Sequence, residues 1–157
     1  MKISCTGHRA TLLLAMILTG TIGYSHAEQT EVDETVKIVI QTDHGDIQGV
    51  LESSTAGKAF AAQLPLELTL KDYHATEKIA DLPARLPTQD APAGIKPVVG
   101  DITYFAPWGN LAIFYKDFSY SNGLVRLGRI EGDLSLLSSK DSMPVRIERV
   151  PAETANP

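Results

Sequence analysis

The chain has 157 residues, of which 43% are hydrophobic, and its formal net charge at neutral pH is −5. This length and composition predict one globular domain with its own core, and they argue against disorder of the whole chain. The acidic balance argues against a nucleic-acid partner, because phosphate binding depends on clustered Lys and Arg.

The first 27 residues have the three parts of a secretory signal peptide. Lys2 and Arg9 supply the positive region, residues 12–22 form an apolar run, and Ala27 ends a small-residue cleavage site. A single anchoring helix is the alternative, but the apolar run is too short to span a bilayer. We therefore expect cleavage after Ala27 and a periplasmic or secreted protein that is not an integral membrane protein.

The single cysteine, Cys5, lies before this apolar run. The lipidated cysteine of a lipoprotein signal would follow the run, so Cys5 is not expected to carry a lipid. After cleavage the chain would have no thiol, and its fold would depend on core packing without disulfides.

The N-terminal part of the mature chain alternates between strand and helix patterns. Residues 28–35 are acidic and lack a period, which is typical of a flexible lead-in. Apolar alternation in 36–42 and 47–51, separated by a polar turn with Gly45, predicts a hairpin. Ser53 or Ser54 can cap a helix with Ala56, Phe60 and Leu64 on one stripe, and Pro65 would end it.

The middle of the chain begins with a third strand. In residues 65–73 every second residue is apolar, which predicts a strand with one face on the core. Four prolines and Gly94 interrupt residues 74–99, so we expect a long loop there. Its apolar residues favour an ordered loop that packs on the domain and lines a site.

The C-terminal part holds most of the aromatic residues. Residues 100–118 predict a second hairpin with a turn at 107–110, and its aromatic residues fall on both faces. A further strand is expected at 124–130 and a last one at 143–150, with a short helical turn capped by Asp133 between them. The tail 151–157 is expected to be disordered. The domain is therefore 36–150, and many short strands with two short helices favour a closed barrel.

Several segments in this order resemble the small bacterial cyclophilin-like proteins. They are STAGKAFAAQLPLELTLKDY, EKIADLP, LPTQDAPAG, GDITYFAPWGNLAIFYKDF and RLGRI, and the resemblance covers about residues 36–150. It implies a mainly β fold, a closed eight-stranded cyclophilin-like β-barrel capped by two short helices. This group is similar to peptidyl-prolyl isomerases in fold but not in active-site sequence, and most of its members have no assigned activity.

The active-site motifs of true cyclophilins have no match in this sequence. Those enzymes carry Arg, Phe, Gln, Trp and His in recognisable segments, one of them similar to F-x-x-x-Q-G-G-D. Here Trp108 falls in a predicted turn, and the mature chain holds only His44 and His74. Isomerase activity by the usual arrangement is therefore not expected.

Neither a metal site nor a hydrolase site is indicated. Two histidines without cysteine or paired spacing do not make a transition-metal site, and no cofactor is predicted. No G-x-S-x-G element accompanies the histidines. The carboxylates of Asp72, Glu77 and Asp81 either converge for acid–base chemistry or form a solvated rim.

A ligand pocket is the remaining candidate. Aromatic residues supply apolar faces with hydroxyl groups, and arginines supply a grip for a carboxylate or phosphate. Arg126 is the leading candidate to bind such a group, because Gly128 on the same side of the strand leaves room for a ligand or another backbone. Alternatively, Arg126 pairs with an acid on a neighbouring strand and the aromatic residues are core. The predicted ligand-binding residues are Arg126, Trp108, Tyr115, Phe105, Tyr73 and Arg85.

Two functions follow from these observations. The first is binding of a small molecule or a peptide segment in the periplasm without strong catalysis. The second is a weak or atypical prolyl isomerase, in which an arginine polarises the prolyl amide inside an apolar pocket. No catalytic residue is identified for either.

Overall fold

The computed structural model describes residues 35–139 and 141–151. The predicted signal peptide 1–27 lies outside the described residues, as do 28–34 of the predicted lead-in and 152–157 of the predicted tail. In the described ranges no helix combines the length and the apolar character needed to cross a membrane.

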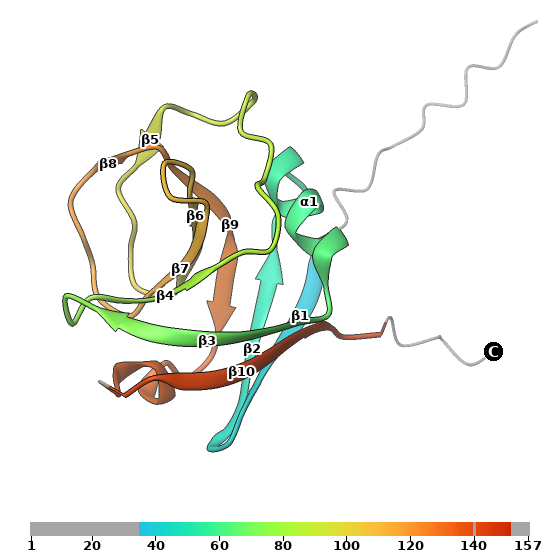
Figure 1. The fold of residues 1–157 in the computed structure, drawn as a ribbon, viewed down its shortest axis with the longest axis vertical. Coiled ribbons are helices and arrows are strands. Elements are labelled where there is room, and N and C mark those ends of the chain that lie inside the picture. Colours follow the sequence, from blue (N-terminus) through green and yellow to red (C-terminus); the bar gives the residue numbers. More distant parts are fainter. Residues whose placement is uncertain (1–34, 140, 152–157) are drawn as a thin grey trace, which may run out of the picture. The chain divides into compact units, whose positions relative to one another are not determined.

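Eight strands of the described residues form a closed β-barrel in which all neighbours are antiparallel (Figure 1). They are β1 (Val36–Thr42), β2 (Gly45–Leu51), β3 (Leu66–Tyr73), β4 (Glu77–Asp81), β6 (Asp101–Phe105), β7 (Asn110–Phe114), β9 (Leu124–Glu131) and β10 (Met143–Arg149). Their order around the barrel is β1-β10-β3-β4-β7-β6-β9-β2. Two short strands, β5 (Gly94–Ile95) and β8 (Ser121–Asn122), pair as a separate sheet. The predicted closed eight-stranded barrel is confirmed, and its closure leaves no barrel strand with a free edge.

The strands that alternate in sequence are buried as predicted. Ile38 and Ile40 on β1 are buried, and so are Val145 and Ile147 on β10, while Arg146 between them is exposed. Side chains at every second position point to the same face, so this pattern places one face of each strand in the barrel interior.

The predicted helix is α1 (Thr55–Gln63), which packs against β2 and β9. Ser54 is its N-cap, and the Ser54 side chain accepts a hydrogen bond from the Gly57 backbone N–H at 3.1 Å. Phe60 has no exposed surface and joins the main core. The helix is therefore stabilised at its start by the cap and along its length by burial of Phe60.

The prediction of a long loop over 74–99 is wrong for residues 77–81, which form β4. This strand pairs with β3 on one side and β7 on the other. It was missed because a lysine occupies an inward position: Lys78 is completely buried, so the sequence shows no apolar alternation.

The prediction of two capping helices is also partly wrong. The described residues hold one α-helix, and the second predicted helix is a four-residue 3₁₀ turn, Ser135–Ser138. Asp133 holds this turn by accepting hydrogen bonds from the Ser135 backbone N–H at 2.8 Å and the Ser135 hydroxyl at 2.6 Å. Among the residues of the turn only Leu137 is buried, and one buried side chain does not sustain a longer helix.

Candidate functional site

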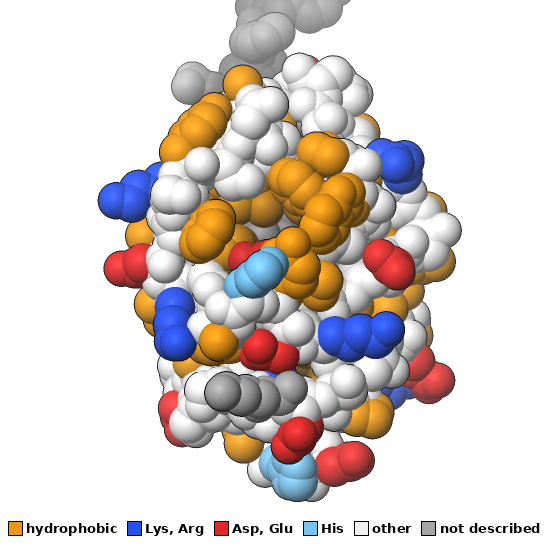
Figure 2. Space-filling view, turned by 60° about the vertical axis from the view of Figure 1, so that its left-hand side comes forward, with side chains coloured by type: hydrophobic (Ala, Val, Ile, Leu, Met, Phe, Trp, Pro, Cys, Tyr) orange, Lys and Arg blue, Asp and Glu red, His pale blue; other side chains and the backbone are white. Residues whose placement is uncertain are grey.

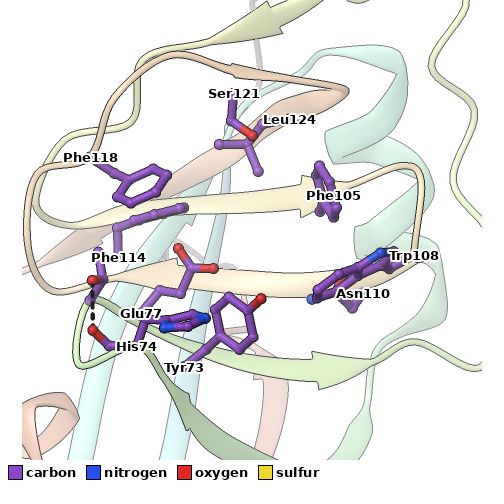
Figure 3. Close-up of a pocket in the computed structure, with 11 residues that line it drawn as sticks. Tyr73, His74, Glu77, Phe105, Trp108, Asn110, Phe114, Phe118, Ser121 and Leu124 are labelled. Carbon is purple, nitrogen blue, oxygen red and sulfur yellow. Dashed lines mark hydrogen bonds between the residues drawn. The ribbon is translucent and has the colours of Figure 1, made fainter.

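The main candidate site is a pocket of about 260 Å³ on the outside of the barrel, over β4, β6 and β7. We call it the aromatic pocket. Figure 2 shows hydrophobic side chains gathered beside a histidine on one face of the molecule, and Figure 3 shows the pocket itself. It is lined by Tyr73, His74, Thr76, Glu77, Phe105, Trp108, Asn110, Phe114, Phe118, Ser121 and Leu124.

Strand alternation places the lining side chains of β4 and β7 outside the barrel. Lys78 on β4 points inward, so its neighbour Glu77 points outward into the pocket. Phe114 lies opposite Glu77 on β7, and it belongs with Leu124 to a second apolar cluster, separate from the main core. Strand β7 is thus buried on both faces, which explains why apolar and aromatic residues occupy neighbouring positions in it.

Three aromatic rings meet nearly at right angles at one end of the pocket. The Trp108 ring lies 5.7 Å from Tyr73 at an angle of 88°, and 5.4 Å from Phe105 at 80°. Trp108 is the only tryptophan of the chain, and it is 57% exposed. Such edge-to-face contacts fix the rings relative to one another, so the wall is shaped before a ligand arrives.

Glu77 is the carboxylic acid of the pocket. In Figure 3 its carboxyl lies between Tyr73 and the phenylalanines Phe114 and Phe118. Burial raises the pKa of Glu77 from the ordinary 4.5 to about 7. The side chain makes no hydrogen bond or ion pair with any residue of the described ranges. Glu77 is therefore a proton donor or acceptor near neutral pH, and it is available to a ligand.

Asn110 adds a second unused acceptor to the lining. The side chain is 3% exposed, and its Nδ2 donates to the Leu111 carbonyl at 3.3 Å. Its Oδ1 is buried and accepts no hydrogen bond from the described residues. A buried amide oxygen without a donor is costly, so this atom favours a ligand that brings an N–H or O–H group.

The edge of the pocket is formed by a turn in an unusual backbone conformation. His74 and Ala75 have φ values of 51° and 53°, in the left-handed region that residues other than glycine rarely adopt. The Ala75 backbone N–H donates to Asp72 Oδ2 at 3.1 Å, and Thr76 N–H donates to the Tyr73 carbonyl at 3.1 Å. These bonds hold the turn, and with it the position of Tyr73 and Glu77 on either side.

Of the six predicted ligand-binding residues, the structure brings Tyr73, Phe105 and Trp108 together in the aromatic pocket. Arg85 lies next to the turn that carries Trp108, where its Nη1 donates to the Ala106 carbonyl at 2.8 Å. It supports that turn from outside the lining.

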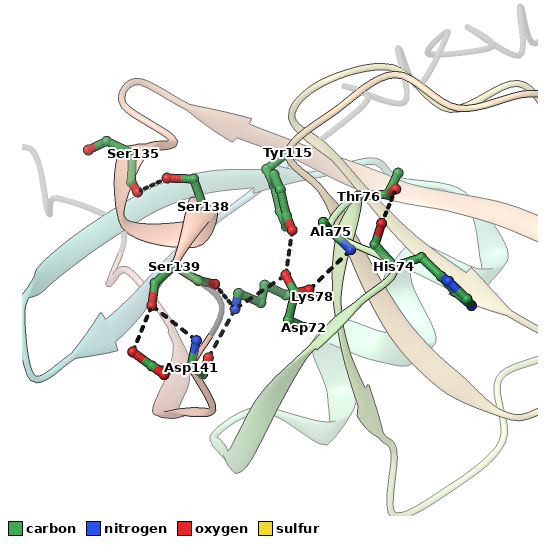
Figure 4. Close-up of polar contacts among 10 residues, drawn as sticks. All are labelled: Asp72, His74, Ala75, Thr76, Lys78, Tyr115, Ser135, Ser138, Ser139 and Asp141. Carbon is green, nitrogen blue, oxygen red and sulfur yellow. Dashed lines mark hydrogen bonds and ion pairs between the residues drawn. The ribbon is translucent and has the colours of Figure 1, made fainter.

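Tyr115 points away from the pocket, into a polar cluster that we call the Lys78 cluster (Figure 4). The Tyr115 hydroxyl donates to Asp72, whose carboxylate lies 3.7 Å from Lys78 Nζ. Lys78 Nζ also donates to the backbone carbonyls of Ser139 and Asp141. Burial, together with the hydrogen bond to Asp72, raises the pKa of Tyr115 to about 12. This cluster joins β3, β4 and the segment after β7 to the segment before β10.

Arg126 also lies outside the aromatic pocket. Its Nη2 is 3.0 Å from Oδ2 of Asp101 on β6, and the Asp101 side chain is 3% exposed. A Cβ at Gly128 would collide with the carbonyl of Val50 on β2, so Gly128 makes room for a neighbouring backbone. Arg126 borders a second cavity, of about 210 Å³, near the start of α1, and its buried Nε has no partner in the described part of the chain.

The sequence did not single out Glu77, Phe114 and Asn110 as pocket residues. Glu77 was grouped with Asp72 and Asp81, but Asp72 belongs to the Lys78 cluster and Asp81 is exposed. Phe114 could have been recognised by its alternation with Ala112, because both lie on the same face of a strand that is buried on both faces. Asn110 carried no signal, because only its buried position distinguishes it from an ordinary turn residue.

No group of three or more His, Cys, Asp or Glu side chains suited to a metal ion occurs within 35–139 and 141–151.

The family model described as the cyclophilin-like family matches residues 40–148. The chain belongs to the cyclophilin-like family. Among solved structures, the solution structure of a hypothetical protein from Archaeoglobus fulgidus is similar, with a TM-score of 0.55 and 19% sequence identity. The match covers 77% of this chain and 99% of the archaeal one, and at this identity it shows a shared fold. The comparison with curated proteins finds no match.

Proposed function

We propose that this cyclophilin-like protein binds a small molecule or an apolar side chain of a peptide segment in the aromatic pocket, without strong catalysis. The observation that carries the proposal is the combination of fixed aromatic walls with two uncommitted polar groups, Glu77 and Asn110 Oδ1. Apolar walls with a few polar groups are the usual composition of a ligand site.

The size of the pocket favours a small ligand or a single side chain. Its volume of about 260 Å³ lies just below the range of roughly 300–1,000 Å³ that is common for small-molecule sites. Trp108 at the rim is largely exposed, so a bound molecule would cover it and change its fluorescence.

We further propose that the protein acts after export. This part of the proposal is supported by the signal-peptide pattern of residues 1–27. Mass spectrometry of the exported protein should find Glu28 at its N-terminus, and an intact Met1 on the exported chain would favour an anchoring helix.

A screen of small molecules and short peptides by thermal shift, followed by Trp108 fluorescence, tests the binding proposal. Trp108→Leu should abolish the thermal shift for a true pocket ligand; this variant is followed by thermal shift alone, because it has no tryptophan. Tyr120→Leu is the matched control, because Tyr120 is equally exposed at 59% but is not part of the lining. Binding that survives Trp108→Leu, detected by thermal shift, would place the ligand elsewhere.

The weaker alternative is prolyl isomerisation. The isomerase mechanism considered from sequence needs an arginine at the prolyl amide, whereas the described lining of the aromatic pocket contains neither Arg nor Lys. We therefore expect no measurable acceleration of proline isomerisation in a peptide assay. Acceleration that is lost in Trp108→Leu would instead establish the protein as an isomerase.

A further inference from the structure

We propose that the aromatic pocket selects small organic ammonium ions, with Glu77 as the counter-charge and the surrounding rings as a cage. This inference rests on the proposed function, because it names the class of ligand for the same pocket. It is carried by the shape of the ring wall, the charge of the lining and the unused acceptors.

The ring wall suits a cation. Trp108 stands nearly perpendicular to both Tyr73 and Phe105, with ring centroids 5.7 and 5.4 Å apart. On the other side of the pocket Phe114 and Phe118 lie 6.3 Å apart with an angle of 32°. A cation over the face of such rings is attracted by their quadrupoles, and tryptophan is the strongest partner.

The described lining contains an acidic side chain but no Lys or Arg. Glu77 is the one carboxylic acid among the described lining residues, and no Lys or Arg accompanies it. His74 is the one histidine among the described lining residues. A carboxylate without a cationic partner, set among apolar rings, favours a positive ligand over an anion or a neutral molecule.

The lining also contains a buried acceptor that has no donor within the described residues. Asn110 uses its Nδ2 on the Leu111 carbonyl and leaves Oδ1 without a donor. An ammonium group that carries N–H bonds satisfies such an acceptor, and a quaternary ammonium meets the same field through its polarised methyl groups.

The proposal also predicts how binding depends on pH. Burial raises the pKa of Glu77 to about 7, so the carboxylate form that attracts a cation is lost as the pH falls below that value. The groups that face or couple to Glu77 are Tyr73 and His74 in the lining and Tyr115 on the segment after β7. Of these side chains only histidine can carry a positive charge, so His74→Asn separates its contribution from that of Glu77.

Choline and 3,3-dimethyl-1-butanol form a suitable pair of probes, because they have nearly the same shape and differ in charge. The charge of choline does not change with pH, so any pH dependence comes from the protein. Calorimetry and Trp108 fluorescence on the mature chain would measure both ligands with the parent protein, Glu77→Gln and His74→Asn. Asparagine is chosen at position 74 because it tolerates the left-handed backbone.

We expect choline to bind about tenfold or more tightly than its neutral analogue, and Glu77→Gln to remove that preference. Choline should bind about tenfold more weakly at pH 6 than at pH 8, and this difference should persist in His74→Asn. Circular dichroism of Glu77→Gln serves as the control that the barrel is intact.

Three results overturn the inference, and they separate it from the proposed function. Equal binding of both probes, unchanged by Glu77→Gln, would retain a ligand pocket but refute the preference for ammonium. Absence of choline binding, with other pocket ligands found in the thermal-shift screen, would also retain the ligand pocket and refute the preference for ammonium. Absence of any pocket ligand in both experiments would refute the proposed function as well.

Discussion

Replacement of Arg126 by methionine tests which of two roles this residue has. Methionine keeps most of the length of the side chain and removes its charge and its hydrogen bonds. In the parent protein Asp101 Oδ2 accepts from Arg126 Nη2 at 3.0 Å and from the Val98 backbone N–H at 3.0 Å. In the variant only the bond from Val98 would remain to the carboxylate.

The expected loss of stability follows from the burial of Asp101. Removal of one partner from a buried ion pair typically costs about 3–5 kcal/mol, because the remaining charge is left uncompensated. The Asp101 side chain is 3% exposed, but the Arg126 side chain is 33% exposed, so water can reach one side of the pair. We therefore expect Arg126→Met to lower the free energy of unfolding by about 2–4 kcal/mol.

Urea unfolding followed by circular dichroism measures this change. Arg129→Met is the matched control, since Arg129 lies on the same strand and is exposed. It should change the free energy of unfolding by less than about 0.5 kcal/mol. The double variant Arg126→Met with Asp101→Asn should lose less than the sum of the two single variants, because the stranded charge is then absent.

Ligand binding separates the two roles. Because Arg126 lies outside the aromatic pocket, binding of a pocket ligand should be unchanged in Arg126→Met at a temperature where the variant is folded. A loss of stability below about 1 kcal/mol together with a loss of binding would refute this reasoning and show that Arg126 takes part in ligand binding.

Three further substitutions test other parts of the structure. Phe60→Ala should lower the free energy of unfolding by about 3–5 kcal/mol, because the fully buried ring leaves a cavity; a loss below about 1 kcal/mol would contradict its burial. Ala75→Gly should raise the free energy of unfolding by about 0.5–1 kcal/mol by relieving the positive φ, whereas a loss would show that the turn is not strained. The pKa of Glu77 in the folded chain, about 7, exceeds its ordinary 4.5. The protonated carboxyl therefore contributes to the free energy of unfolding fully below pH 4.5, and this contribution is lost as the pH rises through about 7. Glu77→Gln should therefore gain stability relative to the parent between about pH 5 and pH 8, on the order of 1–2 kcal/mol after allowance for solvent access, and a gain independent of pH would contradict the assignment.

The barrel itself was largely predictable from sequence. Apolar alternation identified β1, β3 and β10, and the turn residues around Gly45 and after Phe105 located the hairpins. The helix start at Ser54 followed from capping chemistry. These features depend on residues close in sequence, so local patterns carry them.

The candidate site was only partly predictable. Tyr73, Phe105 and Trp108 were singled out because aromatic residues with polar groups are common in ligand sites, and the fold places all three in one pocket. Tyr73 stands beside the β3–β4 turn, whereas Phe105 and Trp108 stand at the β6–β7 turn, at the other end of the β4–β7 pair. Their rings meet only because the side chains reach toward one another across the outside of the barrel. The sequence alone offered Tyr115 as an equal candidate. Successive side chains of an extended chain point to opposite faces, so Tyr115, which follows the pocket residue Phe114, points toward Asp72 instead.

Composition and spacings of two or four residues were enough to predict the faces of the alternating strands, the helix and the acidic character of the chain. Only the tertiary structure decided the roles of the charged residues. Lys78 is buried because its long side chain reaches the carbonyls of Ser139 and Asp141, which lie far away in the sequence. Its inward position turns Glu77 outward, and the packing of β4 beside β7 surrounds that carboxyl with rings. Whether a charge is solvated, paired or left for a ligand depends on neighbours from other strands, and no local pattern in the sequence records them.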